Sequence, residues 1–138
     1  MNAIDSSIVV AALFDAEEHH APCWRLIDVG ELSFFTHGLA EAFSTMTGGR
    51  AALRITPHQA AELLAEDVAP CLHLTTLTPA ETLRALTEGS SRGAQGGAIY
   101  DFLHLAAARK AKAEKFFTLN VADFRALHRT GDPEIAHP

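Results

Sequence analysis

Short apolar runs alternate with longer segments of helical periodicity along the whole sequence, and this alternation limits the possible folds more than any other pattern in the chain. It is typical of a parallel sheet whose strands are joined by helices. The apolar runs predict strands at residues 1–4, 32–36, 72–77 and 115–119, with an edge strand near Ile135. The remaining segments predict helices at residues 8–14, 21–29, 38–47, 57–69, 79–88, 97–113 and 121–127. We therefore expect an α/β fold with a central parallel sheet of four to five strands, flanked by helices on both faces.

Two of the predicted helices begin at a recognisable capping sequence. Thr56-Pro57 and Thr78-Pro79 each place a threonine, which can accept a hydrogen bond from the first turn, before a proline that fits the first helical position. Apolar residues at helical spacing follow both pairs. Both threonines are therefore expected to be N-caps.

The chain has 138 residues, and we expect residues 1–138 to form one domain. Its hydrophobic fraction of 48% is typical of a globular protein. Cys23 and Cys71 lack metal-ligand spacing, so they are interpreted as free, buried thiols in a reducing compartment. The first residues contain no basic leader, and no apolar run approaches the ~20 residues of a membrane span, so the expected location is the cytoplasm.

The formal net charge of −6 weighs against a stoichiometric nucleic-acid binder, because such proteins usually carry a surplus of positive charge. It weighs less against a nuclease. An enzyme with a bound cation can present positive charge to a phosphate locally, whatever its total charge.

Four carboxylates are expected at one edge of the predicted sheet. Asp5 follows the first strand, Glu41 lies early in the helix after the second, and Asp123 follows the strand at residues 115–119. Asp101 begins the long helix after a glycine-rich stretch. In parallel sheets, ligands bind beyond the carboxyl ends of the strands, so the topology predicts that these acids gather there.

Each of these acids has an ordinary structural explanation when taken alone. Asp5 could cap a helix, while Glu41 and Asp123 could be acids favoured near a helix start. Asp101 is harder to explain in this way, because its helix is apolar on nearly all sides and an unpaired buried carboxylate is costly.

Together, the acids predict a site for a hard divalent cation. Clustered carboxylates repel one another, and Mg²⁺ or Mn²⁺ bound by oxygen ligands relieves that repulsion. Such a site suits hydrolysis of a phosphodiester, because the metal activates water and stabilises the leaving oxygen. The sequence offers no comparable serine–histidine arrangement for covalent catalysis.

Four blocks in this order resemble the PIN-domain nucleases, and among them the VapC-like toxins of type II toxin–antitoxin pairs. The resemblance spans almost the whole chain; each block is weakly specific, and the ordered set is strongly so. The blocks are Ile4-Asp5-Ser6-Ser7, Leu39-Ala40-Glu41-Ala42-Phe43, Tyr100-Asp101-Phe102-Leu103-His104-Leu105-Ala106-Ala107-Ala108 and Thr118-Leu119-Asn120-Val121-Ala122-Asp123-Phe124.

The resemblance implies an endoribonuclease that depends on Mg²⁺ or Mn²⁺, cleaves RNA, forms a homodimer and is blocked by a cognate antitoxin protein. It also implies two polar helpers and leaves the number of metal ions open, because many relatives carry an acid where this chain has Asn120. For His104 we expect packing or hydrogen bonding within its helix. The implied catalytic and metal-binding residues are Asp5, Glu41, Asp101 and Asp123, with Ser7 and Asn120 in support.

Basic and aromatic residues suggest where partners would bind. Arg92 lies in a glycine-flanked loop before the Asp101 helix and is predicted to contact a phosphate of the substrate, with Arg50 and Arg54 as weaker candidates. Basic residues at the end of the same helix are interpreted as complements of the helix dipole. A groove among the early helices, with Phe14, Trp24 and Leu26 as candidate residues, is expected to accept an antitoxin helix.

Other functions remain as alternatives. A PIN-type nuclease of RNA processing and a non-catalytic PIN binding module fit the same four blocks. A haloacid-dehalogenase-like phosphatase would need an acid two residues after Asp5, where the chain has Ser7. A receiver domain would need an acid at the end of a central strand, and residues 72–77 end without one.

Overall fold

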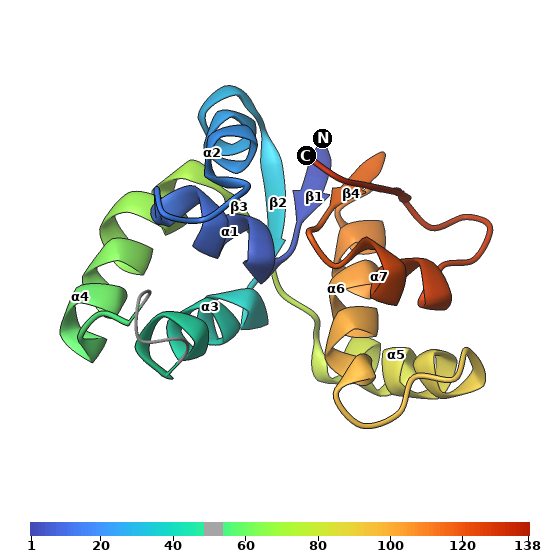
Figure 1. Cartoon of the computed structure of the whole chain (residues 1–138). Coiled ribbons are helices and arrows are strands. Elements are labelled where there is room, and N and C mark those ends of the chain that lie inside the picture. Colours follow the sequence, from blue (N-terminus) through green and yellow to red (C-terminus); the bar gives the residue numbers. More distant parts are fainter. Residues whose placement is uncertain (49–53) are drawn as a thin grey trace.

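A parallel sheet with the strand order β3-β2-β1-β4-β5 forms the centre of the computed structural model, which describes residues 1–48 and 54–138 (Figure 1). The predicted strands are all present, although β3 and β4 end two residues earlier than expected. At the end of β4, the side chain of Thr118 turns toward Asp5. The strands are β1 (Asn2–Ile4), β2 (Leu32–Phe35), β3 (His73–Thr75), β4 (Lys115–Phe117) and β5 (Glu134–Ala136).

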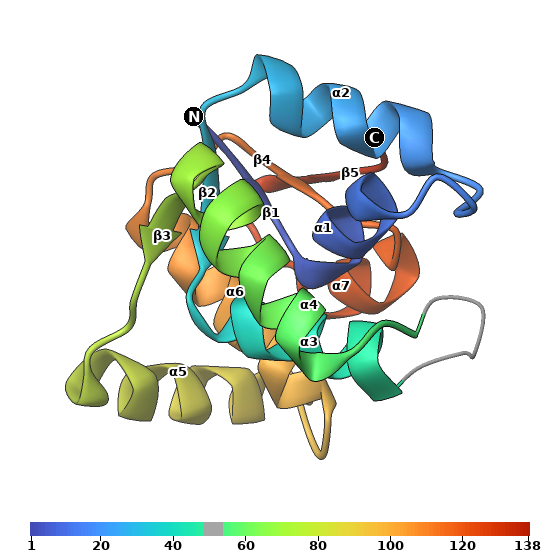
Figure 2. The ribbon, with the colours of Figure 1, turned by 90° about the vertical axis from the view of Figure 1, so that its left-hand side faces the viewer.

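Helices cover both faces of the sheet, as the alternation predicts (Figures 1 and 2). Ile4 and Phe34 pack into the core on the side of the early helices, whereas Ala3 and Phe116 pack into the core on the other side. This division follows from the alternation of side chains along a strand. One layer contains α1 (Ser6–Leu13), α2 (His20–Val29), α3 (His37–Gly48) and α4 (Pro57–Glu62). The other contains α5 (Pro79–Ser91), α6 (Ala98–Lys110) and α7 (Val121–Leu127).

The two predicted N-caps are present. Thr56 and Gln59 form a reciprocal capping box, with distances of 3.1 Å from Gln59 N to Thr56 Oγ1 and 3.0 Å from Thr56 N to Gln59 Oε1. Thr78 Oγ1 accepts a hydrogen bond of 3.2 Å from Glu81 N. The sequence therefore fixes where α4 and α5 begin.

The end of the helix predicted at residues 57–69 is different. The α-helix stops at Glu62, and the chain continues as a π-helical segment, η2 (Leu63–Val68), and a 3₁₀ turn, η3 (Ala69–Cys71). Pro70 lies in that turn, and a proline there lacks the N–H that an α-helix requires. The π-helical segment η2 therefore lies between the end of α4 and the turn that contains Pro70.

The two cysteines are free, and only one of them is buried as predicted. Cys23 lies in the core, and burial raises the pKa of its thiol to about 11, with a further contribution from the charge of Asp5. Cys71 is exposed, because it lies in the surface turn η3, and its thiol donates to Asp67 O at 3.3 Å. Among residues 1–48 and 54–138, no helix has the length and hydropathy of a membrane span.

The strand order places a topological switch between β1 and β4. The chain proceeds from β1 through β2 to β3 on one side, and then returns to add β4 and β5 on the other. The carboxyl ends of β1 and β4 therefore diverge into helices on opposite faces, which is where doubly wound sheets bind their ligands. Asp5 follows β1 and Thr118 follows β4 at this edge.

Candidate functional site

Asp5 is the N-cap of α1 and the most buried of the predicted site acids, with 4% of the residue exposed. Its Oδ1 accepts hydrogen bonds from Ser7 N at 3.1 Å, from Ile8 N at 3.4 Å and from Ser7 Oγ. Its Oδ2 accepts from Thr118 Oγ1 at 2.7 Å. Burial raises the pKa of Asp5, and the hydrogen bonds from Ser7 and Thr118 oppose this effect. Asp5 therefore both caps α1 and lies at the candidate site.

A short hydrogen-bond network joins the ends of β1 and β4. Ser7 Oγ accepts from Leu119 N at 3.0 Å, and Thr118 Oγ1 accepts from Asn120 N at 2.9 Å. Ser7 therefore lies against Asp5, as predicted. Thr118, which is fully buried, was missed as a site residue. The sequence feature that could have identified Thr118 was its hydroxyl side chain near the end of the strand predicted at residues 115–119, inside the fourth sequence block.

Asn120 is exposed, and its side chain does not cap α7. It lines a pocket of ≈ 260 Å³ together with Ser6, Ser7 and Thr45. The amide therefore lies at a pocket that Ser6 and Ser7, the residues after Asp5, also line, and its supporting role stays a prediction.

Asp101 lies in the first turn of α6 and is partly buried. Its pKa is raised to about 6, chiefly by burial and further by the charges of Asp5, Asp123 and Glu41; His104 partly offsets these effects. These carboxylates come from α3, α7 and the start of α1, so distant parts of the chain bring their charges within range of Asp101. Asp123 itself is exposed in the first turn of α7.

Glu41 of α3 is bound by His104 of α6, with 2.6 Å between Oε1 and Nε2. His104 is 2% exposed, and its Nδ1 is buried with no hydrogen-bond partner among the described residues. We expected His104 to pack or to form a hydrogen bond within its own helix. It is buried as expected, but its hydrogen bond joins α6 to α3. Gly38 permits this approach, because a Cβ there would lie 2.4 Å from Phe34 and 3.1 Å from His104.

The donor set of this site is composed of oxygen atoms, which suits Mg²⁺ or Mn²⁺. Over residues 1–48 and 54–138, no three His, Cys, Asp or Glu side chains are already arranged as ligands of one metal ion. Crowded negative charge is nevertheless the condition that a divalent cation relieves, and the charges of Asp5, Asp123 and Glu41 add to the effect of burial in raising the pKa of Asp101. The residues fit a hard cation in charge and in donor type.

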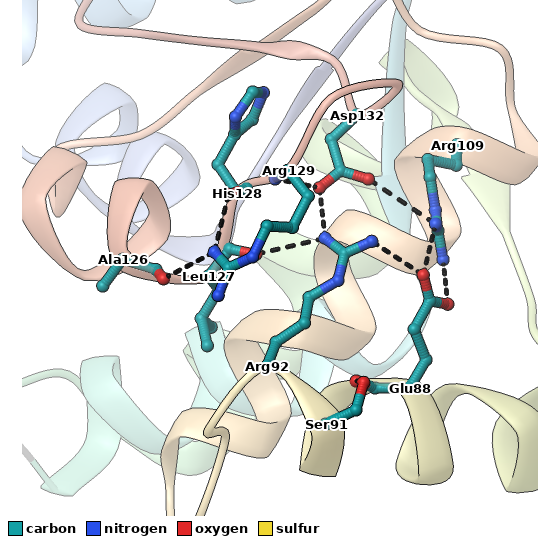
Figure 3. Close-up of polar contacts among 9 residues, drawn as sticks. All are labelled: Glu88, Ser91, Arg92, Arg109, Ala126, Leu127, His128, Arg129 and Asp132. Carbon is teal, nitrogen blue, oxygen red and sulfur yellow. Dashed lines mark hydrogen bonds and ion pairs between the residues drawn. The ribbon is translucent and has the colours of Figure 1, made fainter.

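Arg92 lies in a different environment from the one predicted. Its guanidinium is 10% exposed and lies between Glu88 and Asp132, donating to both and, at 3.1 Å, to Leu127 O (Figure 3). It also lies over the ring of Phe102, 5.0 Å from its centroid. This position argues against the predicted phosphate contact, because three of the N–H donors of Arg92 already bind protein acceptors and its side chain is nearly buried.

The basic end of α6 also binds protein acids. Arg109 donates to both carboxylate oxygens of Glu88, at 2.8 and 2.6 Å, and its hydrogen bonds are the main reason that the pKa of Glu88 falls to about 2. Lys110 donates to Thr76 O at 2.7 Å and to Glu81 at 3.0 Å. Arg109 and Lys110 therefore bind α6 to α5 and to the segment after β3. Of the weaker candidates for RNA contact, Arg50 lies outside the described residues.

A second pocket lies among the early helices, where a partner groove was expected. Its volume is ≈ 730 Å³, and its lining is mostly apolar and includes Trp24, Ile27 and Val29 of α2. Trp24 is 51% exposed. Phe14 and Leu26 are partly buried and pack against the core, so Trp24 is the one of the three candidate residues that lines this pocket.

Comparison with known proteins finds no matching family model but does find a relative. The chain is 33% identical over 112 residues to Ribonuclease VapC27 of Mycobacterium tuberculosis, which covers 81% of this chain and 80% of that protein.

The fold is similar to several solved structures of low sequence identity. VapC20 of Mycobacterium tuberculosis, a toxin that cleaves the sarcin-ricin loop, aligns over 100% of both chains with a TM-score of 0.71 and 17% identity. FitAB, in a structure bound to a DNA fragment, covers 99% of this chain and 94% of its own with a TM-score of 0.70 and 12% identity. FitAcB from Neisseria gonorrhoeae covers 98% and 96%, with a TM-score of 0.63 and 12% identity. These likenesses establish the fold.

Proposed function

The chain belongs to the VapC family of PIN-domain ribonucleases, and on that premise we propose that it is a metal-dependent endoribonuclease and the toxin of a type II toxin–antitoxin pair. Its proposed catalytic and metal-binding residues are Asp5, Glu41, Asp101 and Asp123. The observation that carries this proposal is geometric: Ser7 and Thr118 hold the buried carboxylate of Asp5 where β1 meets β4, and the charges of Asp5, Glu41 and Asp123 all act on Asp101.

The cation that we propose is Mg²⁺ or Mn²⁺. When bound, such an ion supplies charge neutralisation at the phosphate and lowers the pKa of a coordinated water. The protein's own contribution is to orient the acids. Ser7 and Thr118 hold the two oxygens of Asp5, and His104 holds one oxygen of Glu41. Asp123 is exposed and Asn120 lines a pocket, so both are accessible to the substrate.

Cleavage of a mixed RNA pool by the purified protein, free of any partner, tests the activity. It is run with Mg²⁺, with Mn²⁺ and with EDTA, beside Asp101→Asn and beside Asp15→Asn, which removes an exposed acid elsewhere. We expect metal-dependent cleavage that EDTA and Asp101→Asn abolish and Asp15→Asn retains. Cleavage by Asp101→Asn at the wild-type rate would refute the site. RNA binding without cleavage under every condition would instead indicate a non-catalytic binding module.

The proposed protein partner is a cognate antitoxin whose apolar helix occupies the pocket beside Trp24. An exposed tryptophan in an apolar pocket of this size is the kind of anchor that binding helices use. Affinity between the chain and its cognate antitoxin, measured for wild type and for Trp24→Ala, tests this. We expect the variant to bind at least tenfold more weakly. Equal affinities would place the antitoxin on another surface.

We also propose that the protein acts as a homodimer in the cytoplasm. Sedimentation equilibrium of the purified chain tests the assembly, with a mass near twice 14.8 kDa expected. A mass that stays at the monomer value across micromolar concentrations would exclude the dimer.

A further inference from the structure

Two exposed aromatic rings lie against each other beside the carboxylates. His37 begins α3 and Tyr100 lies in the first turn of α6. Their ring centroids are 5.3 Å apart and their planes differ by 7°, which is an offset stack. Tyr100 is 48% exposed, and His37 is exposed as well. A single exposed aromatic residue needs no explanation, but an ordered pair from two separate helices does.

The spacing along the two helices places this pair next to the site. Glu41 follows His37 by four residues on α3, and His104 follows Tyr100 by four residues on α6. Residues four apart share one face of a helix, so the stack lies one helical turn from the Glu41–His104 hydrogen bond on each helix. Asp101 is also the immediate neighbour of Tyr100.

The pair has support from the core beneath it. The ring of Phe35, at the end of β2, lies 5.9 Å from that of His37 and 5.4 Å from that of His104. Phe35 is packed against the core on the α6 side of the sheet. A continuous series of rings therefore runs from the buried His104 through Phe35 and His37 to the exposed Tyr100, and the outer rings are held before any ligand arrives.

We propose that His37 and Tyr100 form a stacking platform for an unpaired nucleobase of the RNA substrate, next to the bond that is cleaved. This inference rests on the proposed function and names how that site holds its substrate. Bases of single-stranded RNA stack on aromatic side chains, and a base on the exposed face of Tyr100 would extend the existing series of rings. Both residues lie in first turns, where the helix dipole favours the phosphates of the same strand.

The platform implies a preference for RNA without base pairs at the cleavage position. A base within a duplex is covered on both faces by its neighbours, so it cannot stack on a protein ring unless it leaves the helix. Duplex RNA of the same sequence is therefore expected to be a poor substrate and a weak ligand.

The test compares variants that keep an aromatic ring with variants that lose one. Tyr100→Phe keeps the ring and Tyr100→Leu removes it; His37→Ala removes the second ring, and His58→Ala is the matched change at an exposed histidine on α4. Two quantities are measured for each: KM and kcat for a single-stranded RNA in Mg²⁺, and Kd in EDTA for the same RNA carrying 2-aminopurine, whose fluorescence is quenched by stacking.

We expect Tyr100→Leu and His37→Ala to raise KM and Kd by about tenfold and to lose quenching, with kcat changed much less. Tyr100→Phe and His58→Ala should match the wild type. Unchanged Kd, KM and quenching in Tyr100→Leu would overturn the platform, and cleavage by the same preparation would leave the nuclease intact. Conversely, wild-type protein that quenches the 2-aminopurine fluorescence but cleaves no RNA would refute the proposed function and support the stacking platform.

Discussion

At the scale of single residues, the network around Asp5 depends on two hydroxyls, those of Ser7 and Thr118. Thr118 Oγ1 donates to Asp5 Oδ2 and accepts from Asn120 N, so it serves a carboxylate and a backbone amide at once. Both partners lie at the edge where β1 meets β4. Removal of the Thr118 hydroxyl would leave the buried Oδ2 of Asp5 and the partly buried N–H of Asn120 without these partners.

Thr118→Val keeps the shape of the side chain and removes the hydroxyl. We expect the free energy of unfolding in urea to fall by about 1–3 kcal/mol, because buried groups lose their partners. Thr47→Val is the matched control, since the hydroxyl of Thr47 donates only to the carbonyl of Phe43 in its own helix. Equal losses in the two variants would contradict the role given to Thr118.

The raised pKa of Asp101 predicts a stability that depends on pH. Its pKa is about 6 in the folded protein, against an ordinary value of 3.8, so the folded state binds this proton first as the pH falls. The contribution of Asp101 therefore favours folding at pH 4 and is lost as the pH rises through 6. Ionised Asp101 weakens the fold at neutral pH.

Asp101→Asn is accordingly expected to raise the free energy of unfolding by about 1 kcal/mol at pH 7.5 in EDTA, after allowance for solvent screening, and to have little effect at pH 4. Urea unfolding at both pH values measures the difference. A variant that is less stable than wild type at pH 7.5 would show that the charge of Asp101 is already compensated by the protein.

The difference between Asp5 and Thr118 shows what the sequence could and could not predict at this scale. The sequence could point to Asp5, Ser7 and the other acids as candidates because each belongs to a short local block. Thr118 was not, because its partner lies 113 positions away and a threonine in a strand is ordinary. The hydrogen bond between Glu41 and His104, 63 positions apart, was missed for the same reason.

At the scale of elements, starts of helices were better predicted than ends. The caps at Thr56 and Thr78 lie within four residues of their partners, so the local sequence specifies them. The end of α4 depends on how Pro70 is accommodated, and the periodicity of residues 57–69 carries no sign of the change to η2. The flanking glycine made Arg92 look like a loop residue, although it is the C-cap of α5 and binds Leu127 O at the end of α7 and Asp132 in the segment after it.

The cluster of Glu88, Arg92, Arg109 and Asp132 joins α5, α6 and the segment before β5 (Figure 3). Arg92→Met leaves the buried carboxylate of Asp132 without its main partner. We expect the free energy of unfolding to fall by about 3–5 kcal/mol in urea, as for other broken buried pairs. His58→Ala, which breaks an exposed pair with Glu62, should change it by less than about 1 kcal/mol.

The same variant separates the two interpretations of Arg92. If Arg92→Met folds as stably as wild type and raises KM for RNA, the original prediction of a phosphate contact is correct and the ion-pair cluster is dispensable. A loss of stability with KM unchanged in the folded fraction supports the structural assignment.

At the scale of the whole molecule, the clustered acids predict that a divalent cation stabilises the folded chain. A ligand bound only by the folded state adds about 2.7 kcal/mol at a hundred times its Kd. We expect saturating Mn²⁺ to raise the Tm of the wild type by on the order of 10 °C. Differential scanning calorimetry with Mn²⁺ and with EDTA measures this shift. Asp101→Asn should lose most of it and Asp15→Asn should keep it; the same shift in both variants would place the cation elsewhere.

The strand order also has a consequence for the time at which the protein becomes active. The site needs Asp5 from one end of the chain and Thr118 from near the other, and β4 fits between β1 and β5. During translation, the ribosome releases Asp5 early, but that carboxylate lacks its partner until β4 has emerged. A nascent chain that stops before residue 118 lacks the hydroxyl that holds Asp5 Oδ2. The proposed nuclease site is therefore incomplete until residue 118 has left the ribosome.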